Sequence, residues 1–348
     1  QANYILIQKL IMLDILLIAI IAIIIGANDA SNVFGSSIGS KMLKFRIAII
    51  FFIIFIILGS VINAQYPSKV YASLIIDYPE LKKIFLVIIP VVIVTIISLK
   101  LKIPSSISQS IIFSLIGFSL VEKLNINYNL FLKLIYFWLA TPILAFAFSI
   151  FFCWIIGFLF RIFKLNIFQI DYQIRLSLIF FGCVAAFALG AHLTAAIVGI
   201  YSPYLSLNLS FIDFNIIIDD RKLYFFGSLL IGLGALLFSQ KIVKTIGSQI
   251  SNIKPIPALA ILLTQILILF SFSSNNIISF INLFLPFEIF AMPLSASHIT
   301  FASIIGIASF NKFREVKPKH TIRIILSWII IPVSVFCCSF LLTSIYLS

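Results

Sequence analysis

The sequence predicts an all-α polytopic membrane protein with about ten spanning helices and further re-entrant or broken segments. Only 10% of its 348 residues are charged, against about 25% in ordinary soluble domains, and its mean hydropathy is +1.22. Apolar runs recur from end to end, and a bilayer core of roughly 30 Å requires about 20 apolar residues per helix. Because a backbone in lipid must satisfy its own hydrogen bonds, these runs are expected to be helices rather than open strands.

The predicted spans follow one another along the whole chain. The first runs from Tyr4 to Ile25 and leads into the polar stretch 26–41. The others are the apolar runs 45–63, 84–99, 107–121, 134–160, 176–200, 223–240, 256–273, 297–310 and 324–346. Residues 66–83 are expected to form a short surface helix, and residues 274–291 an interfacial or re-entrant insertion. The chain is therefore expected to be an integral, multi-pass protein of the plasma (inner) membrane.

The net charge of +13 indicates membrane topology rather than nucleic-acid binding, because the basic residues are scattered between spans and form no long run. Most of the 24 Lys and Arg fall in connections that we place in the cytoplasm: 41–46, 100–102, 161–175, 241–254 and 311–323. The opposite connections carry the acidic residues Asp77, Glu80, Glu122, Asp213, Asp219, Asp220 and Glu288. This asymmetry predicts about ten crossings with both termini outside.

Two pairs of similar segments indicate an internal repeat. GANDASNVFG at 26–35 pairs with GAHLTAAIVG at 190–199, and IPSSISQSIIFSLIG at 103–117 pairs with MPLSASHITFASIIG at 292–306. We therefore expect a first transmembrane repeat at 1–165 and a second at 166–348. An odd number of crossings in each half inverts the second half relative to the first. Inverted repeats with polar, Gly-rich interruptions at matching positions are typical of secondary transporters.

Four glycines are expected to break their helices: Gly26 and Gly35 in the first repeat, and Gly190 and Gly199 in the second. A broken helix exposes unpaired N–H groups at its positive end, and such an end binds anions.

Asp29 is the most informative residue of the stretch 26–41, because a carboxylate within a span is costly and marks an ion or substrate path. Together with Asn28 and Asn32 it could accept a hydrogen bond from a protonated oxyanion, ligate a cation, or carry a proton. Capping of a helix break is the structural alternative.

The segments that begin at Pro104 and Pro293 predict two further helix starts, since Pro suits the first turn of a helix. Their serine hydroxyls could cap the helices or, if the two starts converge at the membrane midplane, bind a tetrahedral oxyanion. His192 and His298 are candidates for substrate or proton contact, and packing is the alternative for both. The candidate substrate-binding residues are Asn28, Asp29, Asn32, Ser106, Ser108, Gln109, His192, Ser295, Ser297 and His298.

These motifs resemble the signatures of the inorganic phosphate transporter (PiT) family. The stretch 26–32 matches its Gly-Ala-Asn-Asp-x-x-Asn signature, Pro293, Ser295 and His298 match its Pro-x-Ser-Thr-Thr-His segment, and 227–255 is similar to its Gly-rich helix. The resemblance implies symport of an oxyanion, usually phosphate, with sodium or protons. It implies no enzymatic activity and no cofactor besides a candidate sodium ion, for which Asn28, Asp29 and Asn32 are the candidate ligands. The lipid bilayer and a second copy of the chain are the other candidate partners.

The sequence departs from this family at several polar positions. His192-Leu193 replaces the second Asn-Asp, and Ser106-Ile107-Ser108-Gln109 replaces the first Ser-Thr-Thr-His. Apolar residues, Ile56 and Leu262, stand near the positions of two family glutamates. Because sodium requires oxygen ligands, these changes leave proton coupling open as well. Sulfate is the alternative substrate. A receptor or an enzyme is a remote alternative, since no nucleotide loop, zinc-spaced His-Glu pair or nucleophile elbow is present.

Overall fold

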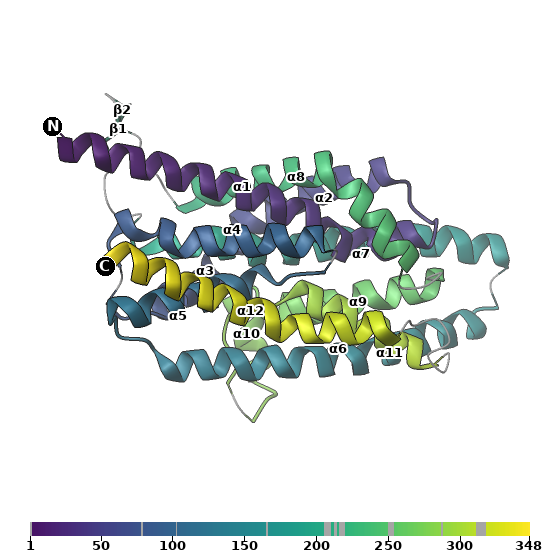
Figure 1. The fold of residues 1–348 in the computed structure, drawn as a ribbon. Coiled ribbons are helices and arrows are strands. Elements are labelled where there is room, and N and C mark those ends of the chain that lie inside the picture. Colours follow the sequence, from purple (N-terminus) through teal and green to yellow (C-terminus); the bar gives the residue numbers. More distant parts are fainter. Residues whose placement is uncertain are drawn as a thin grey trace.

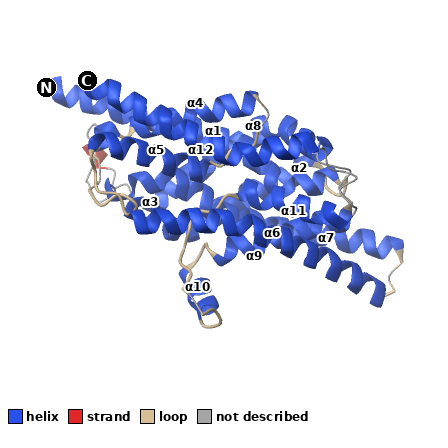
Figure 2. Cartoon of the chain, turned by 60° about the horizontal axis from the view of Figure 1, so that its bottom comes forward, coloured by secondary structure: helices blue, strands red, loops and turns tan. Residues whose placement is uncertain are grey.

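The computed structural model describes residues 2–77, 79–101, 103–164, 166–204, 210–211, 214–215, 220–249, 254–286, 288–310 and 318–348. Most of this part of the chain is helical, and the helices form one elongated bundle (Figure 1). The start of the first helix and the end of the last lie at the same end of the bundle (Figures 1 and 2). An even number of crossings requires this arrangement.

The first half of the chain contains α1 (Ala2–Gly39), α2 (Phe45–Asn63), α3 (Gln65–Ser73), the short 3-10 helix η1 (Leu81–Lys83), α4 (Phe85–Lys100), α5 (Ile107–Glu122) and α6 (Tyr128–Ile162). The second half contains α7 (Ile167–Val198), the 3-10 helix η2 (Gly199–Tyr204), α8 (Asp220–Gln249), α9 (Pro255–Ser271), α10 (Asn275–Asn282), α11 (Ala296–Phe310) and α12 (Pro318–Leu347). Two short antiparallel strands, β1 (Ser210–Phe211) and β2 (Phe214–Asn215), precede α8. Each predicted span coincides with one of the helices, so the prediction that these runs are helical is confirmed.

Length separates these helices into two groups. Among the described residues, six helices are long and apolar enough to cross a membrane: α1, α2, α6, α7, α8 and α12. A seventh span arises if α9 and α10, which are bent by 92° at a short break, count as one. The other apolar helices, α4, α5 and α11, are shorter; α4 has 16 residues and is about 24 Å long. The prediction of about ten crossings therefore stays a prediction.

Two segments outside the predicted spans have defined structures. The segment 66–83 contains a short helix as predicted, α3, with Gln65, Lys69 and Ser73 exposed on one face. Its other face, which includes Tyr71, is buried because η2 packs against it, with Gly199 close to the Tyr71 ring. The segment 274–291 contains α10, which projects from the bundle in Figure 2 and turns sharply away from α9. This agrees with an insertion rather than a straight span.

The glycines of the polar stretch do not interrupt their helix. α1 continues through Gly26 and Gly35, and α7 continues through Gly190, so the predicted helix breaks at these three residues are wrong. At Gly199 the prediction is closer, because α7 ends at Val198 and continues as η2.

Close helix packing is the physical role of Gly26 and Gly190. A Cβ on Gly26 would lie 1.8 Å from the carbonyl oxygen of Ile231 in α8, and a Cβ on Gly190 would lie 2.3 Å from that of Ile56 in α2. Small residues let helix backbones approach closely in membranes, where apolar burial gives little drive for association.

The α1–α8 and α7–α2 crossings are built with the same residue spacing. Gly234 of α8 lies against the carbonyl of Ile23 in α1, one turn before Gly26. Gly59 of α2 lies against the carbonyl of Phe187 in α7, one turn before Gly190. Each pair of helices thus carries a glycine on both sides of its crossing.

A second pair of crossings repeats this pattern. Gly117 of α5 lies against the carbonyl of Phe336 in α12, and Gly306 of α11 lies against the carbonyl of Phe146 in α6. The four crossings join the first half of the chain to the second and hold Asp29 and the two Pro-x-Ser helix starts in one bundle.

Candidate functional site

Three polar residues of α1 form a buried cluster, which we call the Asp29 cluster: Asn28, Asp29 and Asn32. Asp29 is only 4% exposed. Its carboxylate oxygen Oδ1 accepts a hydrogen bond from the Asn32 amide Nδ2 at 2.5 Å and a longer one from Asn28 Nδ2 at 3.3 Å. Because α1 is continuous here, residues one turn apart lie on the same face and can bond in this way. Hydrogen bonds to an ionised carboxylate are among the stronger ones in proteins, so the two amides favour the ionised form of Asp29 and partly offset the cost of its burial.

Gln265 connects this cluster to the second half of the chain. Its amide Nε2 donates to the backbone carbonyl of Asn32 at 2.6 Å and to the Thr300 hydroxyl at 2.5 Å. It thereby joins α1, α9 and α11. Sequence reasoning missed this residue, although an amide within the apolar run 256–273 was a signal that could have found it.

The two Pro-x-Ser segments, 104–109 and 293–298, lie in contact, and their meeting at the membrane midplane stays a prediction. The Ser108 hydroxyl donates to the backbone carbonyl of Leu294 at 3.3 Å. Trp138 of α6 holds the second segment by donating from Nε1 to the carbonyl of Pro293 at 2.9 Å. The starts of α5 and α11, from different halves of the chain, therefore meet inside the bundle. Sequence reasoning also missed Trp138.

Caps at these two helix starts are weak or missing. Ser106 is the N-cap residue of α5, but its side chain makes no cap hydrogen bond. At α11, the Ser295 hydroxyl receives the backbone N–H of His298 at 3.4 Å, which is long, and contacts the Ser297 hydroxyl at 3.1 Å. N–H groups at such helix ends attract anions.

Several buried polar atoms of these starts, or on Gln265 beside α11, have no hydrogen-bond partner among the described residues. They are the hydroxyls of Ser105 and Ser106, Oε1 of Gln109 and of Gln265, and both ring nitrogens of His298. Buried polar groups in proteins are normally paired, so a group of unpaired ones indicates a place for a polar ligand or water.

The two histidines occupy different surroundings. His192 Nε2 lies 2.8 Å from the carbonyl oxygen of Leu269, near the end of α9. Its place in α7 therefore serves a helix contact, and among the described hydrogen bonds none joins it to the Asp29 cluster. His298 stacks on Trp328 of α12, with ring centroids 4.1 Å apart.

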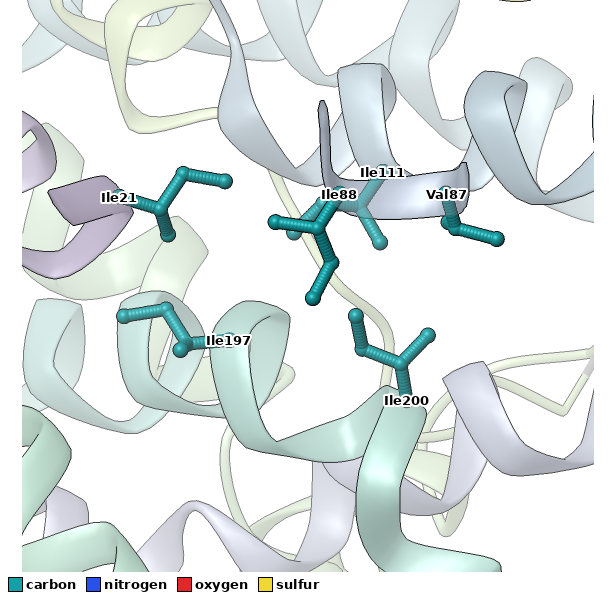
Figure 3. A pocket seen from close by; sticks show the side chains of 6 residues that line it. All are labelled: Ile21, Val87, Ile88, Ile111, Ile197 and Ile200. Carbon is teal, nitrogen blue, oxygen red and sulfur yellow. The ribbon is translucent and has the colours of Figure 1, made fainter. Parts of the chain in front are cut away.

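A small cavity between α1, α4, α5 and α7 is a poor place for an ion. Its volume is about 10 Å³, and aliphatic side chains surround it (Figure 3). They are Ile21, Val87, Ile88, Ile111, Ile197 and Ile200. A cavity of this size holds at most one water and offers it no polar partner.

Comparison with known proteins assigns the family. The model of the Phosphate transporter family matches residues 25–339. The chain belongs to this family. The matched region includes the Asp29 cluster and both Pro-x-Ser segments, so the family resemblance stated from these motifs is confirmed. Because the members of this family are transporters, the family assignment agrees with the prediction that the chain is not an enzyme.

Individual relatives of this phosphate transporter family member are distant but cover nearly its whole length. It is 26% identical over 341 residues to a Bacillus subtilis protein named "Probable low-affinity inorganic phosphate transporter", covering 92% of this chain and 96% of that one. It is 27% identical over 332 residues to the sulfate permease CysP of the same organism, covering 93% and 84%. A solved structure, "The sodium-dependent phosphate transporter", has the same fold, with a TM-score of 0.72 at 17% identity over 97% of this chain and 99% of that one.

The departures from the family pattern lie in apolar surroundings. Ile56 and Leu262, near the expected glutamate positions, are fully buried in the hydrophobic core. Leu193 is also in the core, beside His192. Within the described residues no group of three or more His, Cys, Asp or Glu side chains could hold a metal ion.

Proposed function

We propose that this protein is a secondary active transporter that moves inorganic phosphate across the plasma membrane, coupled to sodium or to protons. The observation that carries the proposal is the contact between Ser108 and the carbonyl of Leu294, which joins two poorly capped helix starts deep in the bundle. Beside it lie unpaired serine hydroxyls and ring nitrogens, and these suit an oxyanion.

Phosphate chemistry suits both parts of this arrangement. Helix-start N–H groups and hydroxyls of Ser106, Ser108, Ser295 and Ser297 would donate to phosphate oxygens. Gln109 and His298, on the same two helix starts, would complete this set. Asp29 would accept a hydrogen bond from a protonated phosphate oxygen, or meet the coupling cation, with Asn28 and Asn32 orienting it.

Sulfate is the second candidate substrate, and the 27% identity to a sulfate permease favours it specifically. Sulfate carries no proton near neutral pH, so it offers Asp29 no hydrogen bond and is repelled by an ionised carboxylate. This difference favours phosphate.

An inverted repeat of residues 1–165 and 166–348 accounts for the matched glycine crossings. In this scheme α1, α2, α4, α5 and α6 correspond to α7, α8, α9, α11 and α12. The Gly26–Ile231 contact then corresponds to Gly190–Ile56, and Gly117–Phe336 to Gly306–Phe146. With the shorter helices α4, α5, α9 and α11 counted as crossings, the scheme gives about ten.

Alternating access is supported by one difference between the proposed repeats. Trp138 and Trp328 occupy corresponding places on α6 and α12. Trp138 donates to the carbonyl of Pro293, whereas Trp328 has an unpaired Nε1 and stacks on His298. We infer that Trp328 donates to the carbonyl of Pro104 in the opposite state of the transport cycle.

Uptake of radiolabelled phosphate into proteoliposomes tests the function. We expect uptake above that of empty vesicles under a sodium gradient or a proton gradient, and the effective gradient identifies the coupling ion. Unlabelled phosphate should compete more strongly than sulfate. Uptake equal to that of empty vesicles under every gradient would contradict the proposal. Stronger competition by sulfate than by phosphate would identify sulfate as the substrate instead.

A further inference from the structure

A groove of about 530 Å³ runs between α4 and the first half of α12, and no residue of the Asp29 cluster lines it. This volume lies within the range of roughly 300–1,000 Å³ typical of small-molecule sites. The groove is lined by Val94, Ile97, Ser98, Leu101, Ile103, Lys319, Ile322, Arg323, Leu326, Ser327, Ile330, Ile331 and Ser334.

Charge and apolar surface are separated along this groove. Its two charged residues, Lys319 and Arg323, are exposed and lie one turn apart near the start of α12. Arg323 Nη2 also donates to the carbonyl of Leu101 at 3.2 Å, which fixes it at the mouth of the groove. Further along, the lining is mainly aliphatic, and Leu326 and Ile330 are 50% and 57% exposed. A groove with these properties presents one charged end and one long aliphatic side.

The corresponding place at the other end of the bundle is filled by aromatic rings. There Phe137 of α6 packs edge-on against Phe272, the residue that follows α9, with ring centroids 5.4 Å apart. Leu101 follows α4 as Phe272 follows α9, and Ser327 precedes Trp328 as Phe137 precedes Trp138. The smaller side chains Leu101 and Ser327 therefore leave space that two phenyl rings occupy in the other half. The sequence itself specifies the groove.

We propose that this groove binds an anionic phospholipid of the cytoplasmic leaflet. The lipid phosphate contacts Lys319 and Arg323, and one acyl chain lies along Ile97, Leu326 and Ile330. From Lys319 to Ser334 the helix rises about 22 Å, close to half of a bilayer of roughly 40–45 Å including its headgroups. Among the described residues that line the groove none is acidic, so the charge of this lining suits an anionic headgroup.

Lipid retention by the purified full-length protein tests this proposal. We would titrate it with phosphatidylglycerol and with phosphatidylcholine of identical acyl chains, and measure bound lipid by native mass spectrometry. We expect preferential retention of phosphatidylglycerol. Substituting both Lys319→Gln and Arg323→Gln should weaken that retention at least tenfold, because each basic residue near a membrane surface contributes about fivefold. Arg161→Gln is the matched control, since Arg161 is an exposed arginine of α6 that also donates to a backbone carbonyl, that of Gly157.

A second variant separates the acyl-chain site from the headgroup site. Ser327→Phe introduces the phenyl ring that Phe137 carries at the corresponding position of the other half. It should exclude the acyl chain while both basic residues stay in place. The double glutamine variant alters only exposed side chains, so it decides the matter even if Ser327→Phe does not fold. Equal retention of the two lipids, or an equal loss in Arg161→Gln, would overturn the proposal. So would displacement of the lipid by inorganic phosphate, or a cross-link between two copies through the groove.

Discussion

Gln265 donates from its side-chain amide to the backbone carbonyl of Asn32 at 2.6 Å, although the two residues belong to different halves of the chain. The same amide nitrogen reaches the Thr300 hydroxyl in α11. Asn32 in turn donates to Asp29. Gln265 therefore links α9 and α11 to the Asp29 cluster through direct hydrogen bonds.

Replacing Gln265 with Leu should destabilise the protein by about 1–3 kcal/mol. The substitution removes both hydrogen bonds and places an apolar side chain against the buried Asn32 carbonyl and Thr300 hydroxyl. Uptake of phosphate should fall as well. Thermal unfolding in detergent and proteoliposome uptake measure the two effects. Thr264→Val is the control, since the Thr264 hydroxyl bonds only within its own helix, to the carbonyl of Ala260. Equal effects of the two substitutions would contradict the role of Gln265.

Asp29→Asn should abolish most transport while leaving folding and insertion normal. The substituted amide has the same shape, but it carries no charge. We expect uptake to fall by roughly 10- to 100-fold, which corresponds to a hydrogen bond to a charged group. Asp14→Asn is the matched control, because Asp14 is another buried carboxylate of α1, more than three turns away from Asp29. Full activity of Asp29→Asn in proteoliposomes would contradict the proposed site.

Local patterns predicted much of this structure. The run 45–63 has the same bounds as α2, and the two Pro-x-Ser segments lead into α5 and α11 as expected of helix starts. The length of an apolar run and a serine-rich helix start depend only on neighbouring residues, so both can be recognised from the sequence alone. By contrast, the partner of Gln265 is 233 positions away, and no local pattern specifies which helix an amide will meet.

The glycines show why the predicted helix breaks at Gly26, Gly35 and Gly190 were wrong. In water, Gly26 and Gly190 would weaken a helix, and that reasoning predicted breaks. In the bundle, the same missing Cβ admits the carbonyl of Ile231 or Ile56, and the contact across the crossing outweighs the local preference. The sequence marks where a glycine lies but not whether a second helix lies against it.

Gly26→Ala should therefore destabilise the protein by about 1–3 kcal/mol or more, because its Cβ would lie 1.8 Å from the Ile231 carbonyl oxygen and the two helices must separate. Thermal unfolding in detergent measures this. Gly157→Ala in α6 is the matched control, with nothing within 4 Å of the added Cβ, and we expect it to be neutral or stabilising by about 0.5–1 kcal/mol. Similar unfolding temperatures for both variants would show that the crossing tolerates separation.

Trp138→Phe and Trp328→Phe should differ, because within the described part of the chain the Trp138 indole donates a hydrogen bond and the Trp328 indole does not. We expect Trp138→Phe to lower stability by about 0.5–1.5 kcal/mol through the lost bond to Pro293. Trp328→Phe should leave unfolding unchanged and slow phosphate uptake, since its proposed partner, Pro104, is reached only in the opposite state. Trp154→Phe, at a residue 52% exposed, controls for the loss of an indole. Unaltered uptake by Trp328→Phe would contradict the proposed exchange of partners.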